Sequence, residues 1–469
     1  MRLDSQRLRT LRTSLVGDRA FYKMLLAVVI PIMIQNAITN FVSLLDNIMV
    51  GQVGTVPMSG VAIANQLMFV FNLCVFGGIS GAGIFSAQYY GAENMEGVRS
   101  CFRFKLYAAL GLAAAAILLF LSEGSGLIGL YLHDEGNAAQ IEETLAHSLR
   151  YLHIMLWGLP AFSLTQVYAS TLRETGHTAL PMRAGIVAVL VNLVFNYILI
   201  FGHLGFPAMG VAGAAVATVL SRYVELAIVV LFSHFNAKKY RFVHGVYAKL
   251  SVPGPLVKQI IIKGMPLLVN EAFWSMGMAT LVQCYSVRGL DVVAAMNISS
   301  TISNLFAVTF ISMGSATAIL VGQVLGSNEL HLAMDRARKL IAFSVFIAAM
   351  AGILLLIVSP FVPLAYRTEA HVRSLASGFL RVYACCMPLF GYANATYFTL
   401  RSGGKTMLTF VFDSGFTWVL CVPLAWCLVH LTGMDVLLIY LCVQLLDIIK
   451  VFFGHYLIKK GVWINNMVV

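Results

Sequence analysis

Charged residues are scarce in this 469-residue sequence, where Asp, Glu, Lys and Arg together make up only 11%. A soluble domain usually carries about 25% charged residues. The chain therefore lacks the polar surface that a water-soluble globule of this size needs. Hydrophobic residues make up 59% of it, which predicts an integral membrane protein and excludes a string of soluble domains.

Motifs for catalysis, ATP hydrolysis and metal binding are also missing. The sequence has no Walker-type phosphate loop, no HExxH and no nucleophile triad signature. Its eight cysteines lie mostly in apolar runs, without CxxC or His/Cys ligand spacing, so we interpret them as packing residues. We expect no disulfide between the neighbours Cys385 and Cys386. The sequence thus predicts no enzyme, no cofactor and no ATP-driven pump.

What the chain has instead is a series of long apolar runs. A spanning helix needs ~20 mostly apolar residues. Because lipid cannot hydrogen-bond the backbone, runs of this length are expected to be helices. The predicted spans are 24–48, 58–84, 104–122, 150–171, 180–201, 208–232, 260–286, 294–322, 340–361, 376–400, 406–430 and 434–458.

The gaps between these runs alternate in charge, and every second gap is basic. The positive-inside rule places basic gaps on the cytoplasmic side, so we expect both termini to be cytoplasmic. The net charge of +11 then reflects anchoring to an anionic leaflet rather than nucleic-acid binding. No cleavable signal peptide is visible, because the first apolar run is too long for one.

The two halves of the sequence resemble each other. Matching positions are 235 residues apart early in each half and 228 apart later: Pro31 and Pro266, Gln88 and Gln323, Gly91 and Gly326, Pro160 and Pro388, Leu172-Arg173 and Leu400-Arg401, Gly176 and Gly404. Six spans per half make a parallel repeat, as in transporters whose halves rock about a central site.

We therefore predict an all-α integral membrane protein with twelve transmembrane helices in two six-helix bundles, related by pseudo-two-fold symmetry along the membrane normal. The expected segments are a cytoplasmic N-terminal segment 1–23, a first bundle 24–232, a cytoplasmic linker 233–259, a second bundle 260–458 and a cytoplasmic tail 459–469.

Three acids lie within predicted spans: Asp46, Glu271 and Asp413. A charge inside a membrane costs at least ~2.5–3.5 kcal/mol, so such acids are functional candidates. Asp46 ends a polar stripe suited to Na⁺ or a proton, although a capping or surface acid is the alternative. Glu271 fits a proton carrier, a contact for a cationic substrate or a structural hydrogen bond. Asp413 is expected to face Glu271, for coupling, substrate contact or structure.

Other candidates are oppositely charged pairs and aromatic side chains. Arg222 with Glu225, and Asp447 with Lys450, are each three residues apart on the last helix of a half. We interpret them as local ion pairs, with an inner gate as the alternative. Trp274 and Tyr392 are candidate substrate contacts because aromatic faces attract organic cations.

Several motifs together resemble the multidrug and toxic compound extrusion (MATE) family over nearly the whole chain. They are Pro31 with Asp46-Asn47-Ile48-Met49-Val50-Gly51, Gln88-Tyr89-Tyr90-Gly91, Leu172-Arg173-x-x-Gly176 with Pro181, Asn192-x-x-x-Asn196 with Ile200-Phe201-Gly202, Gly210-Val211-x-Gly213-Ala214-Ala215, and Leu400-Arg401-Ser402-Gly403-Gly404.

This resemblance implies export of organic compounds, often lipophilic cations, driven by inward Na⁺ or H⁺. By resemblance, Asp46 matches a coupling acid of some members, with partners at Asn192 and Asn196. Some relatives have Asp where this chain has Asn196. A single carboxylate among amide oxygens suits one Na⁺, whereas two close carboxylates would share a proton.

The leading hypothesis is thus a cation-coupled multidrug antiporter of a bacterial inner membrane. Its expected partners are an organic small molecule and the lipid bilayer, with no nucleic acid, and we expect a monomer. A lipid-linked-saccharide flippase of the same superfamily is the second reading, although few Arg or Lys lie within the spans. An intramembrane enzyme or a receptor is the third.

Overall fold

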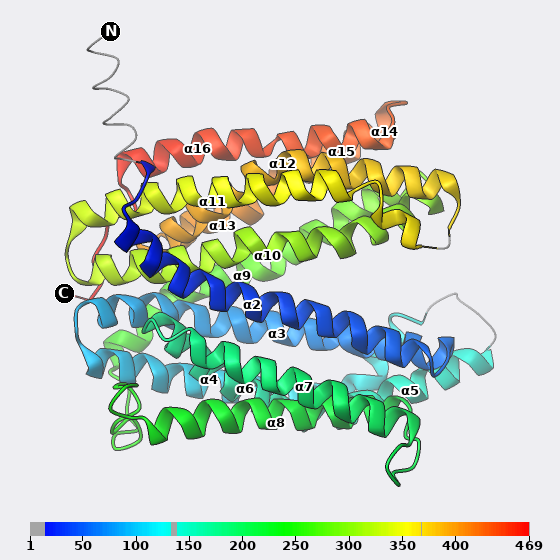
Figure 1. Ribbon diagram of the computed structural model, residues 1–469, viewed down its shortest axis with the longest axis horizontal. Coiled ribbons are helices and arrows are strands. Elements are labelled where there is room, and N and C mark those ends of the chain that lie inside the picture. Colours follow the sequence, from blue (N-terminus) through cyan, green and yellow to red (C-terminus); the bar gives the residue numbers. More distant parts are fainter. Residues whose placement is uncertain (1–14, 133–137, 367, 469) are drawn as a thin grey trace. The chain divides into compact units, whose positions relative to one another are not determined.

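A computed structural model describes residues 15–132, 138–366 and 368–468, so the first fourteen residues of the predicted segment 1–23 lie outside it. The described residues form helices and no strand (Figure 1). Their contacts divide the chain into two units. We call Ile34–Ser86 with Met95–Ile260 the N unit. The C unit comprises Ile261–Val469, Ala87–Asn94 and the described part of Met1–Met33.

The first-half helices follow the predicted spans closely. They are α2 (Arg19–Gly51), α3 (Thr55–Gly91), α4 (Met95–Gly129), α5 (Ala138–Leu156), α6 (Leu159–Glu174), α7 (Ala179–Phe201) and α8 (Val211–Phe235). The predicted span 150–171 is divided between α5 and α6. Its break falls at Gly158, just before Pro160, which lacks the N–H that a helix interior uses.

The second-half helices include one irregular span. The elements are α9 (Gly254–Ser286), α10 (Leu290–Gly326), α11 (Leu330–Val358), the 3₁₀ turn η1 (Val362–Ala365), α12 (Ala370–Ser402), α13 (Thr406–Phe410), the π-helical turns η2 (Val411–Gly415) and η3 (Thr417–Cys421), α14 (Val422–Leu431), α15 (Val436–Leu445) and α16 (Asp447–Lys460). Predicted span 406–430 thus contains two π-helical turns, and span 434–458 is α15 followed by α16.

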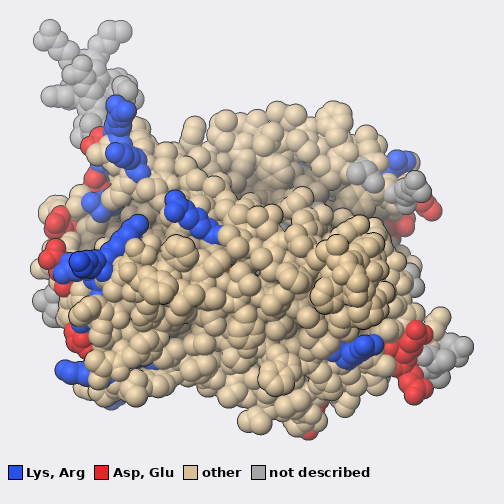
Figure 2. All heavy atoms as spheres, turned by 60° about the horizontal axis from the view of Figure 1, so that its bottom comes forward, with Lys and Arg blue, Asp and Glu red and all other residues tan. Residues whose placement is uncertain are grey.

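Ten helical stretches among the described residues are long and apolar enough to cross a membrane. The two predicted spans outside this set are the broken α5–α6 pair and α9, which carries Lys258, Lys263 and Glu271. On the face shown in Figure 2, charged side chains gather toward the ends of the helices and leave a broad uncharged surface between them. Such a belt is what contact with lipid tails requires.

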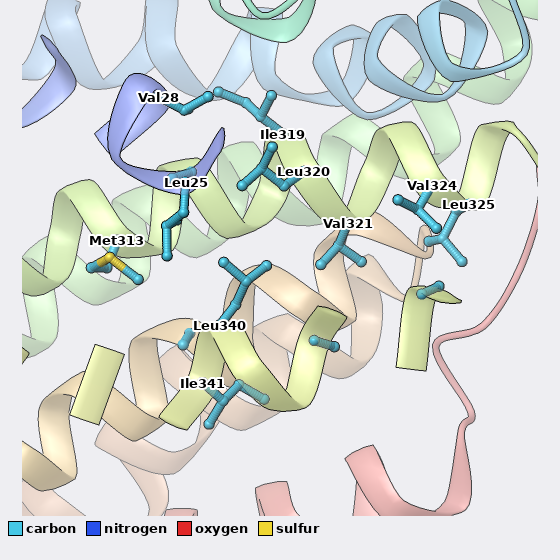
Figure 3. Packing of buried hydrophobic residues seen from close by; sticks show 14 of the residues in the cluster. Leu25, Val28, Met313, Ile319, Leu320, Val321, Val324, Leu325, Leu340 and Ile341 are labelled. Atoms are coloured by element: carbon cyan, nitrogen blue, oxygen red, sulfur yellow. The ribbon is translucent and has the colours of Figure 1, made fainter. Parts of the chain in front are cut away.

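The first turns of α2 pack in the C unit. Leu25 and Val28 of α2 are buried against Ile319 and Leu320 of α10 (Figure 3). The contacts of Met24–Met33 thus group this segment with the C unit, whereas the predicted first bundle, 24–232, included it. The end of α3, Ala87–Asn94, likewise groups with the C unit.

A close crossing explains the repeated Gln-x-x-Gly motif. A Cβ added at Gly91 would overlap the carbonyl oxygen of Gln323, and one at Gly326 would overlap the carbonyl oxygen of Gln88. Each glycine thus faces the glutamine of the other copy of the motif. The repeat encodes a symmetric contact at which no side chain fits.

The C-terminal tail covers this crossing in the C unit. Trp463 is fully buried, and the Met467 N–H donates to Gln88 Oε1 at 2.8 Å. The Gln88 amide donates to the carbonyl oxygens of Ser402 (2.9 Å) and Asn465 (3.2 Å). The predicted linker 233–259 is also packed, because Phe242 and Val246 are each 1% exposed within the N unit.

We predict that Gly326→Ala lowers the free energy of unfolding by about 1–3 kcal/mol, because the added methyl forces two backbones apart. Gly91→Ala should have a similar effect. Thermal unfolding of the purified protein in detergent measures this loss.

Gly111→Ala is the matched control, because nothing lies within 4 Å of an added Cβ at Gly111 in α4. Alanine is also the better helix former there. Equal losses for Gly111→Ala and Gly326→Ala would show that the crossing is not the tight contact described here.

Candidate functional site

The N unit brings Asp46 of α2 together with two asparagines of α7. The Asn196 amide nitrogen donates to Asp46 Oδ1 at 2.6 Å and to Asn192 Oδ1 at 3.1 Å. Asn192 in turn donates to Thr218 Oγ1 of α8 at 3.3 Å. Asn192 and Asn196 share one face of α7 because they are four residues apart. Three helices therefore deliver four oxygen-bearing side chains to one place.

One oxygen in this cluster has no partner. Asn196 is 1% exposed, and its Oδ1 accepts no hydrogen bond from the described residues. An unsatisfied buried polar atom is unfavourable in an apolar surrounding. A cation at this position would satisfy it, because amide, hydroxyl and carboxylate oxygens are the ligands of hard cations.

Charged and phenolic groups surround the cluster. Arg222 of α8 is 3.2 Å from Glu225 and 5.3 Å from the Phe162 ring centroid. Its guanidinium also lies within electrostatic range of Asp46. Tyr151 of α5 is buried and donates to Asn65 Oδ1 at 3.3 Å. The predicted local pair Arg222–Glu225 is present, and it lies beside the Asp46 cluster.

The internal repeat shows that this cluster belongs to the first half alone. With the offset of 235 residues for the early spans and 228 for the later ones, Asp46 corresponds to Leu281 (46 + 235). Asn192, Asn196 and Thr218 correspond to Leu420, Leu424 and Leu446 (each + 228). All four polar positions are leucine in the second half, which therefore cannot form this site.

The C unit has a polar cluster at other repeat positions. Asn270 of α9 donates to Asp413 Oδ2 at 3.1 Å and to the Tyr397 hydroxyl at 3.3 Å. Its own Oδ1 accepts from Ser414 Oγ at 2.7 Å. Asp413 and Ser414 lie in the π-helical turn η2. Such a turn shifts the side chains that follow it, and π-helical turns are frequent at functional sites.

Lys450 of α16 links this cluster to Asp447. Its ammonium is 3.5 Å from Asp447 Oδ1 and 3.7 Å from Asp413 Oδ1, and it lies 4.9 Å from the Phe416 ring centroid. The prediction of a local pair within one helix was incomplete, since a third charge from another helix joins it. Lys450 is only 11% exposed, so the three groups depend on one another.

The remaining candidate residues, Glu271, Trp274 and Tyr392, form no hydrogen-bonded cluster with one another. Glu271 lies within electrostatic range of Arg401 and Asp413, and its carboxylate makes no hydrogen bond or ion pair with the described residues. Trp274, one turn along α9, is 38% exposed. Tyr392 lies elsewhere: its hydroxyl is 3.5 Å from His455 Nδ1, and its ring packs against the C-unit core.

Sequence reasoning missed a buried ion pair in the N unit. Lys105 is fully buried and bonds Glu174, Ser170 and Thr171. Arg103 is also buried and donates to the Val246 carbonyl oxygen at 2.8 Å. By their charge both belong to one of the basic gaps, at the edge of the predicted span 104–122. The available signal was Lys105 standing inside the apolar run 104–122.

The described residues contain no group of three His, Cys, Asp or Glu side chains that could hold a metal ion. The Asp46 cluster offers one carboxylate and three neutral oxygen-bearing side chains. That donor set fits a monovalent cation or a proton better than a divalent metal, which prefers several carboxylates.

Comparison with known proteins identifies the family. The MatE family profile matches residues 31–198 and 266–427, most of the chain. This chain belongs to the MatE family. A probable multidrug resistance protein, YoeA of Bacillus subtilis, is 25% identical over 415 residues, which cover 87% of each chain. A probable multidrug resistance protein NorM of Thermotoga maritima is 25% identical over 409 residues, covering 87% of this chain and 85% of NorM.

Solved structures share the fold of this MATE protein. One described as an outward-facing multidrug resistance MATE family transporter of the MOP superfamily matches with a TM-score of 0.83 at 21% identity, covering 96% of this chain and 98% of the other. A MATE transporter of Vibrio cholerae matches with a TM-score of 0.84 at 17% identity, covering 94% and 97%.

These findings confirm several predictions from the sequence. The protein is an α-helical, multi-pass membrane transporter of small molecules and not an enzyme, and its twelve-helix plan is that of the MATE fold. The coupling ion, the substrate and the roles of individual residues remain predictions.

We predict that Lys450→Gln lowers the free energy of unfolding by about 1–3 kcal/mol, because it leaves two partly buried carboxylates without their counter-ion. The double variant with Asp413→Asn should recover part of this loss. Unfolding of the two single variants and the double variant gives the coupling energy.

Lys339→Gln is the control, because Lys339 pairs with the half-exposed Asp335 at 2.6 Å within one helix. A pair of that kind contributes at most about 1 kcal/mol. Strict additivity of Lys450→Gln and Asp413→Asn, within about 0.5 kcal/mol, would contradict the interaction between the two side chains.

Proposed function

We propose that this MATE transporter exports organic, lipophilic cationic compounds in exchange for one inward monovalent cation, Na⁺ or H⁺, which binds at Asp46. Its similarity to proteins named as multidrug resistance proteins supports the substrate class. The transporter works by alternating access as a monomer in a bacterial inner membrane, with both termini cytoplasmic. It needs no cofactor besides the coupling ion.

The unpartnered Asn196 oxygen beside Asp46 carries this proposal. A structural hydrogen-bond cluster would use both ends of a fully buried amide, since an unmade buried bond costs about 1–3 kcal/mol. In Asn196 the amide nitrogen donates to Asp46 and Asn192, and the amide oxygen has no partner among the described residues. A Na⁺ ion would use that oxygen directly, and a hydronium ion or a protonated Asp46 would donate to it.

Arg222 limits the charge that this site accepts. Asp46 is the one carboxylate of the cluster, because Glu225 pairs with Arg222 at 3.2 Å and also lies within electrostatic range of Arg173. One monovalent cation neutralises the group, whereas a divalent cation would leave an excess positive charge in an apolar surrounding. The nearby guanidinium also weakens the hold of Asp46 on its cation, and this favours release.

The C unit supplies the contact for the substrate's positive charge. Glu271, Asp413 and Asp447 carry three negative charges, against two positive charges on Arg401 and Lys450. One negative charge therefore remains, and Glu271 is the acid without a bonded partner. Trp274 stands three residues along the same helix, with its ring 38% exposed. A carboxylate beside an aromatic face suits an organic ammonium group.

Because the ion and the substrate bind at separate sites, their exchange depends on how each ligand shifts the equilibrium between two conformations of the transporter. A cation at Asp46 stabilises one conformation of the transporter, and substrate at Glu271 stabilises the other. Each ligand then promotes the conformation in which the other leaves. The coupling requires that the two ligands differ in their preferred conformation and does not require a shared residue.

We predict that Asp46→Asn abolishes gradient-driven export of a cationic dye, because an amide cannot bind Na⁺ as an anion or carry a proton. The measurement is dye efflux from proteoliposomes, with Na⁺ and pH gradients imposed separately. Wild type should respond to one of the two gradients, which identifies the coupling ion.

Asp291→Asn is the control variant, because Asp291 is an exposed acid in the first turn of α10. It should transport as wild type does. Full gradient-driven export by Asp46→Asn would show that Asp46 takes no part in coupling. If neither gradient drives export by the wild type, the proposal of cation-coupled antiport is wrong.

We predict that Glu271→Gln raises the KM for a cationic dye by about tenfold, the loss of one charge interaction. Its dependence on the driving ion should stay unchanged, and a neutral substrate of similar size should show no change in KM. A loss of ion dependence with an unaltered KM would move Glu271 from substrate binding to coupling.

A further inference from the structure

The expected outer end of the C unit carries arginines where the charge rule disfavours them. The gap between α11 and α12 falls on the non-cytoplasmic side, because basic gaps alternate with neutral or acidic ones. Arg373 and Arg381 nevertheless lie in the first twelve residues of α12. They serve neither the Asp46 cluster nor the Asp413 cluster.

These two arginines line one cavity of about 460 Å³. They are eight residues apart on α12, which separates their Cα atoms by roughly 12 Å along the helix. Ser377 and Gly378, which lie between them in the sequence, also line this cavity. A Cβ at Gly378 would meet Leu437 at 2.5 Å, so the close approach of Leu437 from α15 shapes the far wall.

The arginines of the cavity have no partners among the described residues. Neither guanidinium makes a hydrogen bond or ion pair with them, and no acidic side chain among them lines the cavity. Arg373 is partly buried and Arg381 is exposed. The Ser377 hydroxyl oxygen is buried and is not open to the cavity. Two positive charges on the wall of one cavity, without an acid beside them, point to an anionic ligand.

Phosphate is the anion that this geometry suits. Guanidinium groups bind phosphate oxygens through paired, charge-assisted hydrogen bonds. The rim of the cavity is apolar. Leu364 lines it and is 61% exposed, and the neighbouring Phe361 is 65% exposed. Exposed apolar side chains at the end of a span are expected at the membrane interface, where acyl chains begin.

We propose that this cavity binds the phosphate group of an anionic phospholipid of the outer leaflet, held by Arg373 and Arg381. Free inorganic phosphate shares the charged part of this chemistry and lacks the acyl chains that the apolar rim would contact. Two positive charges without an acid favour a lipid with a net negative charge over a zwitterionic one. The bound lipid would brace α12 against α15.

Lipid titration of the purified full-length protein in detergent tests this site. Phosphatidylglycerol should raise the melting temperature saturably, and phosphatidylcholine should raise it little. In Arg373→Gln with Arg381→Gln, the apparent affinity for phosphatidylglycerol should fall by at least about tenfold, the loss of one charge-assisted bond. Ser377→Ala, which changes no charge, should leave this affinity unchanged, because the buried Ser377 hydroxyl is not open to the cavity.

Lys258→Gln with Arg338→Gln is the control pair, because it removes the same charge from two exposed residues at the expected cytoplasmic side. It should bind phosphatidylglycerol as wild type does. Stabilisation by inorganic phosphate but not by phosphatidylglycerol would overturn the lipid as ligand. An equal loss in both pairs, or no saturable effect of either ligand in wild type, would overturn the site.

Discussion

A polar group in a lipid bilayer must find its partner inside the protein, and this constraint governs the whole molecule. It makes the long apolar runs helical, and it explains the ion pairs that tie one helix to another. Lys105 with Glu174, and Lys450 with Asp413 and Asp447, are satisfied in this way. Several buried polar atoms have no partner among the described residues, and Asn196 Oδ1 is one of them. The carboxylate of the partly buried Glu271 also makes no bond with these residues. The proposed function places its two ligands at these two groups.

The two halves are copies of one internal repeat, but they place their buried polar side chains at different positions. The Gln-x-x-Gly motif keeps the repeat visible, because each copy needs a glycine where the other's backbone passes. Away from that crossing the halves diverge. The first half has four polar side chains where the second has four leucines, and Asp413 occupies the position that corresponds to Gly185. In the proposed function, this divergence assigns the small inorganic cation to the first half and the larger organic cation to the second.

Much of the fold could be predicted from the sequence, because span length and gap charge report directly on the bilayer. The polar stripe of α2 and the i, i+4 asparagines of α7 were also visible. The pairing of Asp413 with Lys450 was not, because two π-helical turns alter the helical phase on which such predictions rest. Burial of Lys105 and Arg103 was also hidden, since a basic residue near a span end is usually solvated. The C-terminal tail bonds Gln88 through residues some 380 positions away in the sequence. No local sequence pattern predicts such a contact.

The central claim is that the Asp46 cluster holds one monovalent cation. Its most direct test counts cations: Na⁺ binding and proton uptake are measured on the same purified sample, for wild type, Asp46→Asn and Glu271→Gln. The account predicts one positive charge taken up per chain, as Na⁺ or as a proton, by wild type and Glu271→Gln, and none by Asp46→Asn. Uptake that survives in Asp46→Asn, or is lost in Glu271→Gln alone, would place the coupling site in the C unit and contradict the account.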